Sequence, residues 1–324
     1  MLNANKLVRD TILGKNNSTV TPVYGWLFEN MRGKIQSEFG SVENFEDKYN
    51  FDLAHIFGGP QFCDIEEIER MRNRNIEITP EMFLDMPLND IDNAGDYDNV
   101  IKALKHHKQE RGRFCYIQAN GIFECLNNVF GIENHLAYLL MYPDELQLVY
   151  QRQAEWNRKF AEHAIELGID MVHISDDWGS QNSLLFSPSL LRGMIMPYHK
   201  ATCDFVKSKG AFVSLHSDGN ITDALPVIRE LGYHLIHPWQ ESAGMSYDLY
   251  LREYSGQFAI MGGMCIQTSL GFGNMEKLHD DIRRVFGLLK GKRWVCCTTH
   301  FVQEHCSLEE LVYAYDLINK LSGK

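Results

Sequence analysis

The sequence lacks a long apolar segment, and this absence limits where the protein can work. None of its 324 residues belongs to a run that approaches the roughly 20 apolar residues of a membrane-spanning helix; the segment LAYLLMY is far too short. The first twenty residues also lack an apolar run after a basic start, which argues against a signal peptide. We therefore predict a cytoplasmic protein with no membrane partner.

An excess of positive charge is also missing. The chain has 31 Lys and Arg residues against 43 Asp and Glu residues, and its net charge is −12. Because an acidic protein is repelled by phosphates, we expect no nucleic-acid partner. The eight cysteines are scattered and form no CxxC pair. This pattern favours buried free thiols over a disulfide framework.

Apolar segments alternate with amphipathic helical segments along most of the chain. The predicted strands are residues 21–26, 51–57, 113–120, 170–178, 211–219, 233–240, 258–264 and 293–300. This alternation is typical of an α/β protein with a parallel sheet, and eight strands favour a single (β/α)8 TIM-type barrel. A doubly wound open sheet is the alternative, but it more often carries a glycine-rich phosphate turn, which VYGWLFEN lacks.

We predict one domain over residues 1–324, because no Pro-, Gly- or Ser-rich linker interrupts the chain. The amphipathic segment 3–14 forms an N-terminal helical extension. Residues 61–112 form an insertion after the second strand, and their role stays open. Ser307 and Glu310 have the spacing of a capping box and predict the start of the last helix.

Polar side chains gather where the predicted strands end, which is where (β/α)8 barrels place their working residues. In AFVSLHSDGN, His216 and Asp218 share one face, because strand side chains alternate. His300 follows the last strand. We predict that His216, Asp218 and His300 hold zinc or another divalent metal, and that Gln240 or Glu241 adds an oxygen ligand. Alternatively, the histidines bind substrate or pair with carboxylates.

A second polar group follows the fourth predicted strand. Asp176 and Asp177 precede Trp178, and a carboxylate beside an indole can have a raised pKa and act as a general acid or base. The alternative is an ion pair or a helix cap. The predicted catalytic residues are Asp177, Gln240, Glu241 and His300.

Several other residues at the strand ends are predicted to bind substrate. They are Trp26, Asn120, Asp176, Trp178, Gln181, Trp239, Gly263 and Gln267. The tryptophans would give a cavity flat walls, or they would pack on the rim. Gly263 would let a ligand approach the backbone, or it would form a tight corner of the barrel.

Four segments in succession carry a family resemblance: DDWGSQNSLLFSPSLLRGMIMPYHK, LHSDGNITDALPVIRELGYHLIHPWQ, IMGGMCIQTSLGFG and CCTTHFVQEHCSLEELVYAYD. This succession resembles the uroporphyrinogen decarboxylase superfamily, whose members are (β/α)8 barrels. One branch decarboxylates the acetate arms of a tetrapyrrole without a cofactor. Of its pattern, His300 fits here, whereas its Arg-rich segment is matched only by the displaced Arg32 and Lys34.

The other branch contains corrinoid-linked methyltransferases, which hold zinc through His-x-Cys after strand five and Cys after strand eight. His216 stands at the histidine position, and Asp218 and His300 stand at the two cysteine positions. Gln240 or Glu241 falls where related enzymes have an acidic ligand. The resemblance implies a methyltransferase that moves a methyl group from a small O- or N-methylated donor to a corrinoid protein.

In this interpretation a metal, or His300 with Asp177, polarises the oxygen or nitrogen atom that loses the methyl group. The corrinoid is carried by a partner protein. A decarboxylase acting on a tetrapyrrole and a non-catalytic ligand-binding barrel are the alternative functions. By analogy with related families, a homodimer is expected.

Overall fold

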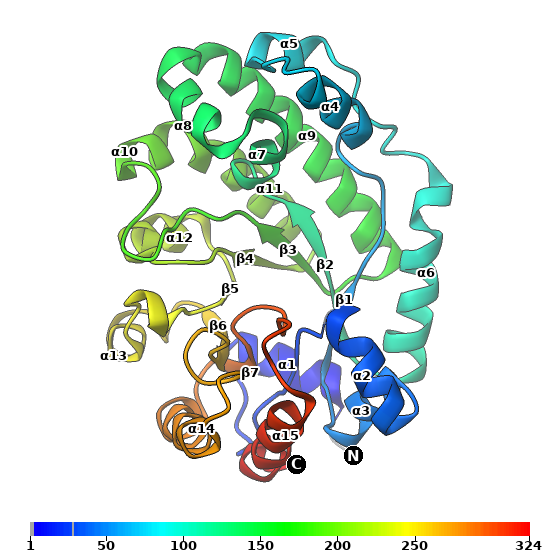
Figure 1. The fold of residues 1–324 in the computed structure, drawn as a ribbon, viewed down its shortest axis with the longest axis vertical. Helices are drawn as coiled ribbons and strands as arrows, with labels where there is room; N and C mark the ends of the chain where they lie inside the picture. Colours follow the sequence, from blue (N-terminus) through cyan, green and yellow to red (C-terminus); the bar gives the residue numbers. More distant parts are fainter. Residues whose placement is uncertain (1–2, 28) are drawn as a thin grey trace. The chain divides into compact units, whose positions relative to one another are not determined.

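The computed structural model describes residues 3–27 and 29–324, and it has an α/β fold. Within these residues seven strands form a sheet in sequence order (Figure 1). They are β1 (Leu53–Ile56), β2 (Phe114–Asn120), β3 (Met171–Ser175), β4 (Phe212–His216), β5 (Leu235–His237), β6 (Ala259–Met264) and β7 (Trp294–Thr298). The pairings β2–β3, β3–β4, β5–β6 and β6–β7 are parallel. The predicted α/β class with a parallel sheet is confirmed.

The segment predicted as the first strand, residues 21–26, is not a strand. Val23 forms a single parallel bridge with Cys296, whose N–H donates to the carbonyl of Pro22 over 2.9 Å. On the other side, the N–H of Asp52 donates to the carbonyl of Val23 over 2.9 Å. The hydrogen-bonded ladder does not extend beyond this bridge, because Pro22 has no N–H to donate and the N–H of Val23 donates to the Asp52 side chain over 2.7 Å. The described sheet therefore has seven strands instead of the predicted eight.

The contacts of the chain divide it into two compact units. The first unit contains Met1–His55, His107–Cys115 and His234–Lys324, and the second contains Ile56–His106 and Tyr116–Tyr233. The prediction of a single domain stays a prediction.

The second unit contains β3, β4 and the helices that cover them. Its helices are α4 (Ile65–Asn73), α5 (Pro80–Asp85), η1 (Ala94–Tyr97), α6 (Asp98–Leu104), α7 (Glu124–Phe130), α8 (Ile132–Met141), α9 (Pro143–Leu167), α10 (Pro188–Leu190), η3 (Leu191–Ile195), α11 (Met196–Ser208), η4 (Thr222–Ala224) and α12 (Leu225–Leu231). Helix α9 packs against β3 and α11 against β4, and the two helices contact each other (Figure 1). Pro197 lies in the first turn of α11, and the π-helical turn η3 directly precedes that helix.

The two faces of β3 and β4 differ in chemistry. Val172 and Ile174 alternate with His173 along β3, and all three are buried. In the β3–β4 register His173 lies beside Ser214 and Ser175 beside His216, so the polar residues share one face. The apolar residues lie on the opposite face, which is the face that helices must cover in a parallel sheet. The polar face is therefore where a site can be built.

The first unit contains β5, β6, β7 and both chain ends. Its helices are α1 (Ala4–Ile12), α2 (Glu29–Phe39), α3 (Val42–Lys48), η5 (Glu241–Ala243), α13 (Tyr247–Leu249), η6 (Tyr250–Tyr254), α14 (Met275–Leu289) and α15 (Leu308–Ser322), and η2 (Lys105–Glu110) adjoins it in sequence. Helix α14 packs on β6 and α1 contacts β7. The predicted capping box is present: Glu310 N–H donates to Ser307 Oγ over 3.1 Å, and Ser307 N–H donates to Glu310 Oε2 over 3.3 Å. Among the described residues no helix is both long and apolar enough to span a bilayer.

Candidate active site

One histidine and two aspartates lie together where β3 and β4 end, within the second unit. His216 is the last residue of β4, and its Nε2 lies 3.8 Å from Asp218 Oδ1 and 3.9 Å from Asp177 Oδ1. Asp177 Oδ1 also accepts the backbone N–H of Asp218 over 2.7 Å. The imidazole is buried, whereas about a third of each carboxylate side chain is exposed (35% and 36%). Solvent and small solutes can thus reach the carboxylates but not the body of the ring.

Two glycines allow the loops that carry these aspartates to touch. A Cβ on Gly179 would lie 2.6 Å from the carbonyl oxygen of Asp218, and one on Gly219 would lie 2.4 Å from that of Ser180. Gly219 also has a φ of +81°, which side chains rarely adopt. Backbone therefore packs on backbone, and this contact keeps Asp218 within reach of Asp177.

A third carboxylate, Glu124, belongs to the same group and was missed by the sequence analysis. It begins α7, and its Oε2 accepts the hydroxyl of Ser175 over 2.9 Å. Burial, together with repulsion from Asp177 and Asp176, raises the pKa of Glu124 to about 7. Burial and repulsion from Asp177 and Glu124 also raise the pKa of Asp218 to about 7. Three carboxylates in one place favour a bound cation or a retained proton.

Asp176 has a different environment from its neighbour Asp177. It is fully buried and accepts the backbone N–H groups of Ile122, Phe123 and Glu124 over 3.1, 2.9 and 2.6 Å. It also accepts the indole N–H of Trp178 over 2.8 Å, and that tryptophan is fully buried. Asp176 thus caps the start of α7, which was the alternative interpretation of this residue. The burial of Asp176 and Trp178 does not favour the predicted direct contact with a substrate.

His199 on α11 completes the environment of Asp176. Its Nε2 lies 2.7 Å from Asp176 Oδ2, and its Nδ1 lies 2.6 Å from the hydroxyl of Tyr233. All three side chains are buried. His199 was not among the predicted site residues. The structure shows that it links α11 to the tip of β3.

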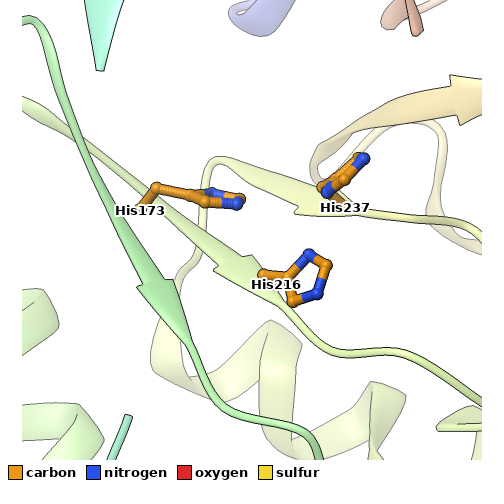
Figure 2. Close-up of side chains that lie close together, drawn as sticks. All are labelled: His173, His216 and His237. Atoms are coloured by element: carbon orange, nitrogen blue, oxygen red, sulfur yellow. The ribbon is translucent and has the colours of Figure 1, made fainter. Parts of the chain in front are cut away.

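A second histidine, His173, lies on the same face as His216 but one step deeper in the sheet. It is buried in the middle of β3, and its ring centroid lies 5.8 Å from that of His216 (Figure 2). Its Nδ1 lies 2.6 Å from Ser214 Oγ on β4. The predicted site residues come from the strand tips, whereas His173 lies inside an otherwise apolar strand.

The first unit groups two predicted residues, Trp26 and His300, with His237 around the end of β7. Trp26 donates its backbone N–H to Thr298 Oγ1 over 3.2 Å, and its ring centroid lies 5.0 Å from that of His300 and 5.9 Å from that of His237. The Nε2 of His237 lies 3.0 Å from the carbonyl oxygen of Thr298. Burial lowers the pKa of His237 to about 4 and also lowers the pKa of His300. Both imidazoles are therefore neutral near pH 7, as metal ligands must be.

The predicted residues after β5 bind one another or a surface arginine. Gln240 is buried and donates to Gln267 Oε1 over 2.8 Å, whereas Gln267 is exposed. Glu241 forms a two-point ion pair with Arg284 of α14, at 3.1 and 2.6 Å. Trp239 is buried and donates its indole N–H to the carbonyl of Ser246 over 3.2 Å. These contacts explain all four side chains as local structure.

Asn120 and Gln181 have surroundings that leave them open to solutes. Asn120 ends β2 and lines a cavity of about 300 Å³ together with Cys125, Trp156 and Phe160. Gln181 is exposed in the loop after β3.

Gly263 in β6 is surrounded by side chains of its own unit. Its φ is +104°, and a Cβ there would lie 3.0 Å from Val285 Cγ1 and 3.1 Å from Trp294 Cζ2. The packing alternative therefore accounts for this glycine.

Replacing Gly263 by alanine is expected to lower the free energy of unfolding by about 1–3 kcal/mol, because the new methyl group combines an unfavourable φ with crowding. Urea denaturation measures this, with Gly287→Ala as control, since nothing lies within 4 Å of a Cβ on Gly287 in the last turn of α14. Equal stability of the two variants would contradict the packing role.

The potential metal ligands that lie together within the second unit are the pairs His173–His216 and His216–Asp218. The predicted third ligand, His300, belongs to the first unit, and its place in a common site stays a prediction.

The fold and the position of these groups define an α/β protein with a polar site at the carboxyl ends of parallel strands. The family profile of uroporphyrinogen decarboxylase (URO-D) matches residues 70–321. The chain belongs to this family, as its sequence motifs predicted.

Solved structures with a similar fold are remote in sequence. A methyltransferase from Methanosarcina mazei aligns over 99% of both chains with 13% identity and a TM-score of 0.72. A B12-independent methionine synthase from a Shewanella species, solved with selenomethionine, covers 94% of this chain and 93% of its own, with 9% identity and a TM-score of 0.54. A sugar phosphate isomerase/epimerase from Parabacteroides distasonis covers 94% and 97%, with 9% identity and a TM-score of 0.51. No curated protein sequence matches the chain significantly. At such identities the likeness concerns the fold alone.

Proposed function

We propose that the protein is a metal-assisted methyltransferase that takes a methyl group from a small O- or N-methylated compound. The observation that carries this proposal is the position of His216 between two carboxylates, 3.8 Å from Asp218 and 3.9 Å from Asp177. Membership of the URO-D family and the fold shared with a methyltransferase support it.

The donor atoms of this group suit a divalent metal. Two ligands bound to one tetrahedral zinc at about 2.0–2.1 Å lie about 3.4 Å apart, so 3.8 Å between His216 Nε2 and Asp218 Oδ1 needs only a small side-chain rotation. One imidazole and one carboxylate suit zinc, iron or manganese. In this proposal His300 is the third ligand, as the sequence analysis predicted, and a fourth position stays open for the methyl donor.

When bound, a metal would act as a Lewis acid on the donor's oxygen or nitrogen and make it a better leaving group. The protein's own groups have separate roles. Asp177 accepts the N–H of Asp218 and so orients that ligand. Glu124, with a pKa of about 7, can hold the proton that the departing oxygen or nitrogen requires. The predicted catalytic role of Asp177 thus becomes one of positioning in this proposal.

The methyl acceptor in this proposal is a cobalt corrinoid on a partner protein, as the family resemblance implies. The alternative of tetrapyrrole decarboxylation has less support from the site. Glu124, Asp177 and Asp218 offer acidic groups, whereas the carboxylates of such a substrate require positive charge.

Activity is tested with free cob(I)alamin as acceptor and a panel of methoxy compounds and methylamines as donors. We expect methylcobalamin, detected by its absorbance, to form with at least one donor in the presence of zinc and not after chelation. The variant Asp218→Asn is expected to lose about 100-fold or more in rate, because an amide is a weaker ligand than a carboxylate.

Asp248→Asn is the control, since Asp248 is exposed at α13 in the other unit. Carbon dioxide released from a porphyrinogen, with no methyl transfer from any donor, would contradict the proposed function. So would an Asp218→Asn variant with unchanged rate.

A further inference from the structure

A cavity of about 300 Å³ lies beside the candidate site, and the residues that line it all belong to the second unit. Asn120 at the end of β2 and Cys125 in α7 are part of its wall. In the β2–β3 register Asn120 lies beside Ser175, whose hydroxyl donates to Glu124 Oε2 over 2.9 Å. The cavity therefore shares the end of β2 and the start of α7 with the site that contains Glu124.

Aromatic rings form the buried wall of this cavity. Trp156 and Phe160 of α9 stack with ring centroids 5.6 Å apart and an angle of 7° between their planes. Phe62 meets Trp156 edge-on, also at 5.6 Å, and all three side chains are buried. Gly59 brings backbone against the same rings, because a Cβ there would lie 2.5 Å from Phe160 Cε2. Flat walls of this kind suit a flat, apolar ligand body.

The wall of the cavity offers no charge to a ligand. None of the described residues that line it is acidic or basic. Burial raises the pKa of the Cys63 thiol to about 11 and also raises that of Cys125, so both thiols are neutral at pH 7. A charged ligand would lose its hydration here without gaining an ionic partner. The cavity therefore suits an uncharged compound.

Trp156 also offers an unused hydrogen-bond donor. Its indole N–H is buried and has no acceptor among the residues that the structure describes. By contrast, the buried indoles of Trp178 and Trp239 each donate to an oxygen atom. Because a buried N–H without an acceptor is costly, a ligand that brings an oxygen atom to Trp156 gains more than an apolar ligand of equal shape.

We propose that this cavity binds an uncharged, flat compound of one ring, with an oxygen atom that accepts the indole N–H of Trp156. A cavity of roughly 150 Å³ holds one benzene, so about 300 Å³ has room for a ring with small substituents. Given the proposed function, on which this inference rests, the bound compound is the methyl donor itself. The cavity then selects neutral methoxy compounds over methylamines, which are cations at neutral pH, and over methoxy acids.

The test is calorimetry of the metal-free full-length protein with anisole and with ethylbenzene, which has the same shape as anisole but no oxygen. We expect the wild type to bind anisole about tenfold more tightly, the effect of one hydrogen bond. 4-Methoxybenzoate and 4-methoxybenzylammonium should bind at least about 100-fold more weakly than neutral 4-methoxytoluene. In Trp156→Phe the preference for anisole over ethylbenzene should fall below about twofold, because the flat wall remains and the N–H is gone.

Two controls accompany this titration. Tyr313→Phe removes a hydroxyl from the surface of the other unit and should keep the preference for anisole. Labelling with a methanethiosulfonate, followed by mass spectrometry, locates the ligand: anisole should slow the modification of Cys125 but not that of Cys265, which is equally half-buried and belongs to the other unit. Circular dichroism and a melting curve establish that each variant is folded.

Three results would each overturn the inference: equal affinity of the wild type for anisole and ethylbenzene, an unchanged preference in folded Trp156→Phe, or labelling of Cys125 that anisole does not slow. If methylcobalamin still formed from a methylamine, the proposed function would survive this failure. Conversely, anisole that binds as expected while no donor yields methylcobalamin would refute the proposed function and support the binding cavity.

Discussion

Replacing Asp176 by asparagine is expected to lower the free energy of unfolding by about 3–5 kcal/mol, a large part of the 5–15 kcal/mol that stabilises a typical protein. Oδ1 of Asp176 accepts two backbone N–H groups, and Oδ2 accepts a third together with the Trp178 indole and His199. In asparagine an NH2 group replaces one of these two oxygens. This NH2 group is itself a hydrogen-bond donor and cannot accept the N–H groups that the oxygen accepted. At least two buried N–H groups would then lose their acceptor.

Urea denaturation of the two variants Asp176→Asn and Asp177→Asn measures this effect with a close control. Asp177 accepts one backbone N–H, from Asp218, and an asparagine oxygen can accept it equally well. We expect Asp177→Asn to change stability by less than about 1 kcal/mol and to lower metal affinity instead, because it removes a charge beside His216. If Asp177→Asn were as unstable as Asp176→Asn, the assignment of Asp176 to structure and Asp177 to function would be wrong.

The division of roles between these neighbours could not be predicted from the sequence. Both aspartates follow the same strand, and local rules place both near its carboxyl end. Their roles differ because of contacts that are distant in sequence. The backbone at the start of α7, about fifty residues earlier, donates to Asp176, and His199 of α11 lies within hydrogen-bond distance of the same side chain. The proximity of His216 and Asp218 was predictable, because the alternation of strand side chains depends on local sequence alone.

Glu124 and His173 were missed for two different reasons. Glu124 opens a seven-residue helix shortly after β2, and the N-cap residue Phe123 supplies no side-chain hydrogen bond that would mark the start of the helix in the sequence. His173 stands among apolar residues in β3, where an imidazole resembles core. Only the register of β3 against β4 places it beside Ser214 and on the same face as His216.

The strands after the first were predictable because each is a short apolar run between a helix and a polar tip. The predicted strand 21–26 has the same composition, yet its ladder is limited to one bridge by Pro22 and by the side chain of Asp52. Asp52 accepts the backbone N–H of a residue almost thirty positions away, and the local sequence around residues 21–26 cannot predict such a contact. Similarly, the pairing of Glu241 with Arg284 joins η5 to α14 and could not be read from either segment.

Replacing His216 by alanine is expected to lower metal affinity by at least about 100-fold and to reduce methyl transfer to background. His216 lies 3.8 Å from Asp218 and 3.9 Å from Asp177, so the proposed metal site cannot survive its loss. Elemental analysis of protein purified without chelator measures the metal, and methylcobalamin formation measures the rate.

Because His216 is buried, its removal can also affect folding, and His216→Gln serves as a second variant that largely preserves side-chain volume. His279→Ala is the matched control, since His279 lies on α14 in the other unit and bonds only at the surface, 2.9 Å from the Tyr313 hydroxyl. We expect His216→Gln to melt near the wild-type temperature and still to lack metal, while His279→Ala retains both metal and activity. Wild-type metal content in a folded His216→Gln variant would show that the proposed site binds no ion. The carboxylates of Glu124, Asp177 and Asp218 would then act as proton-transfer or substrate-binding groups without a metal.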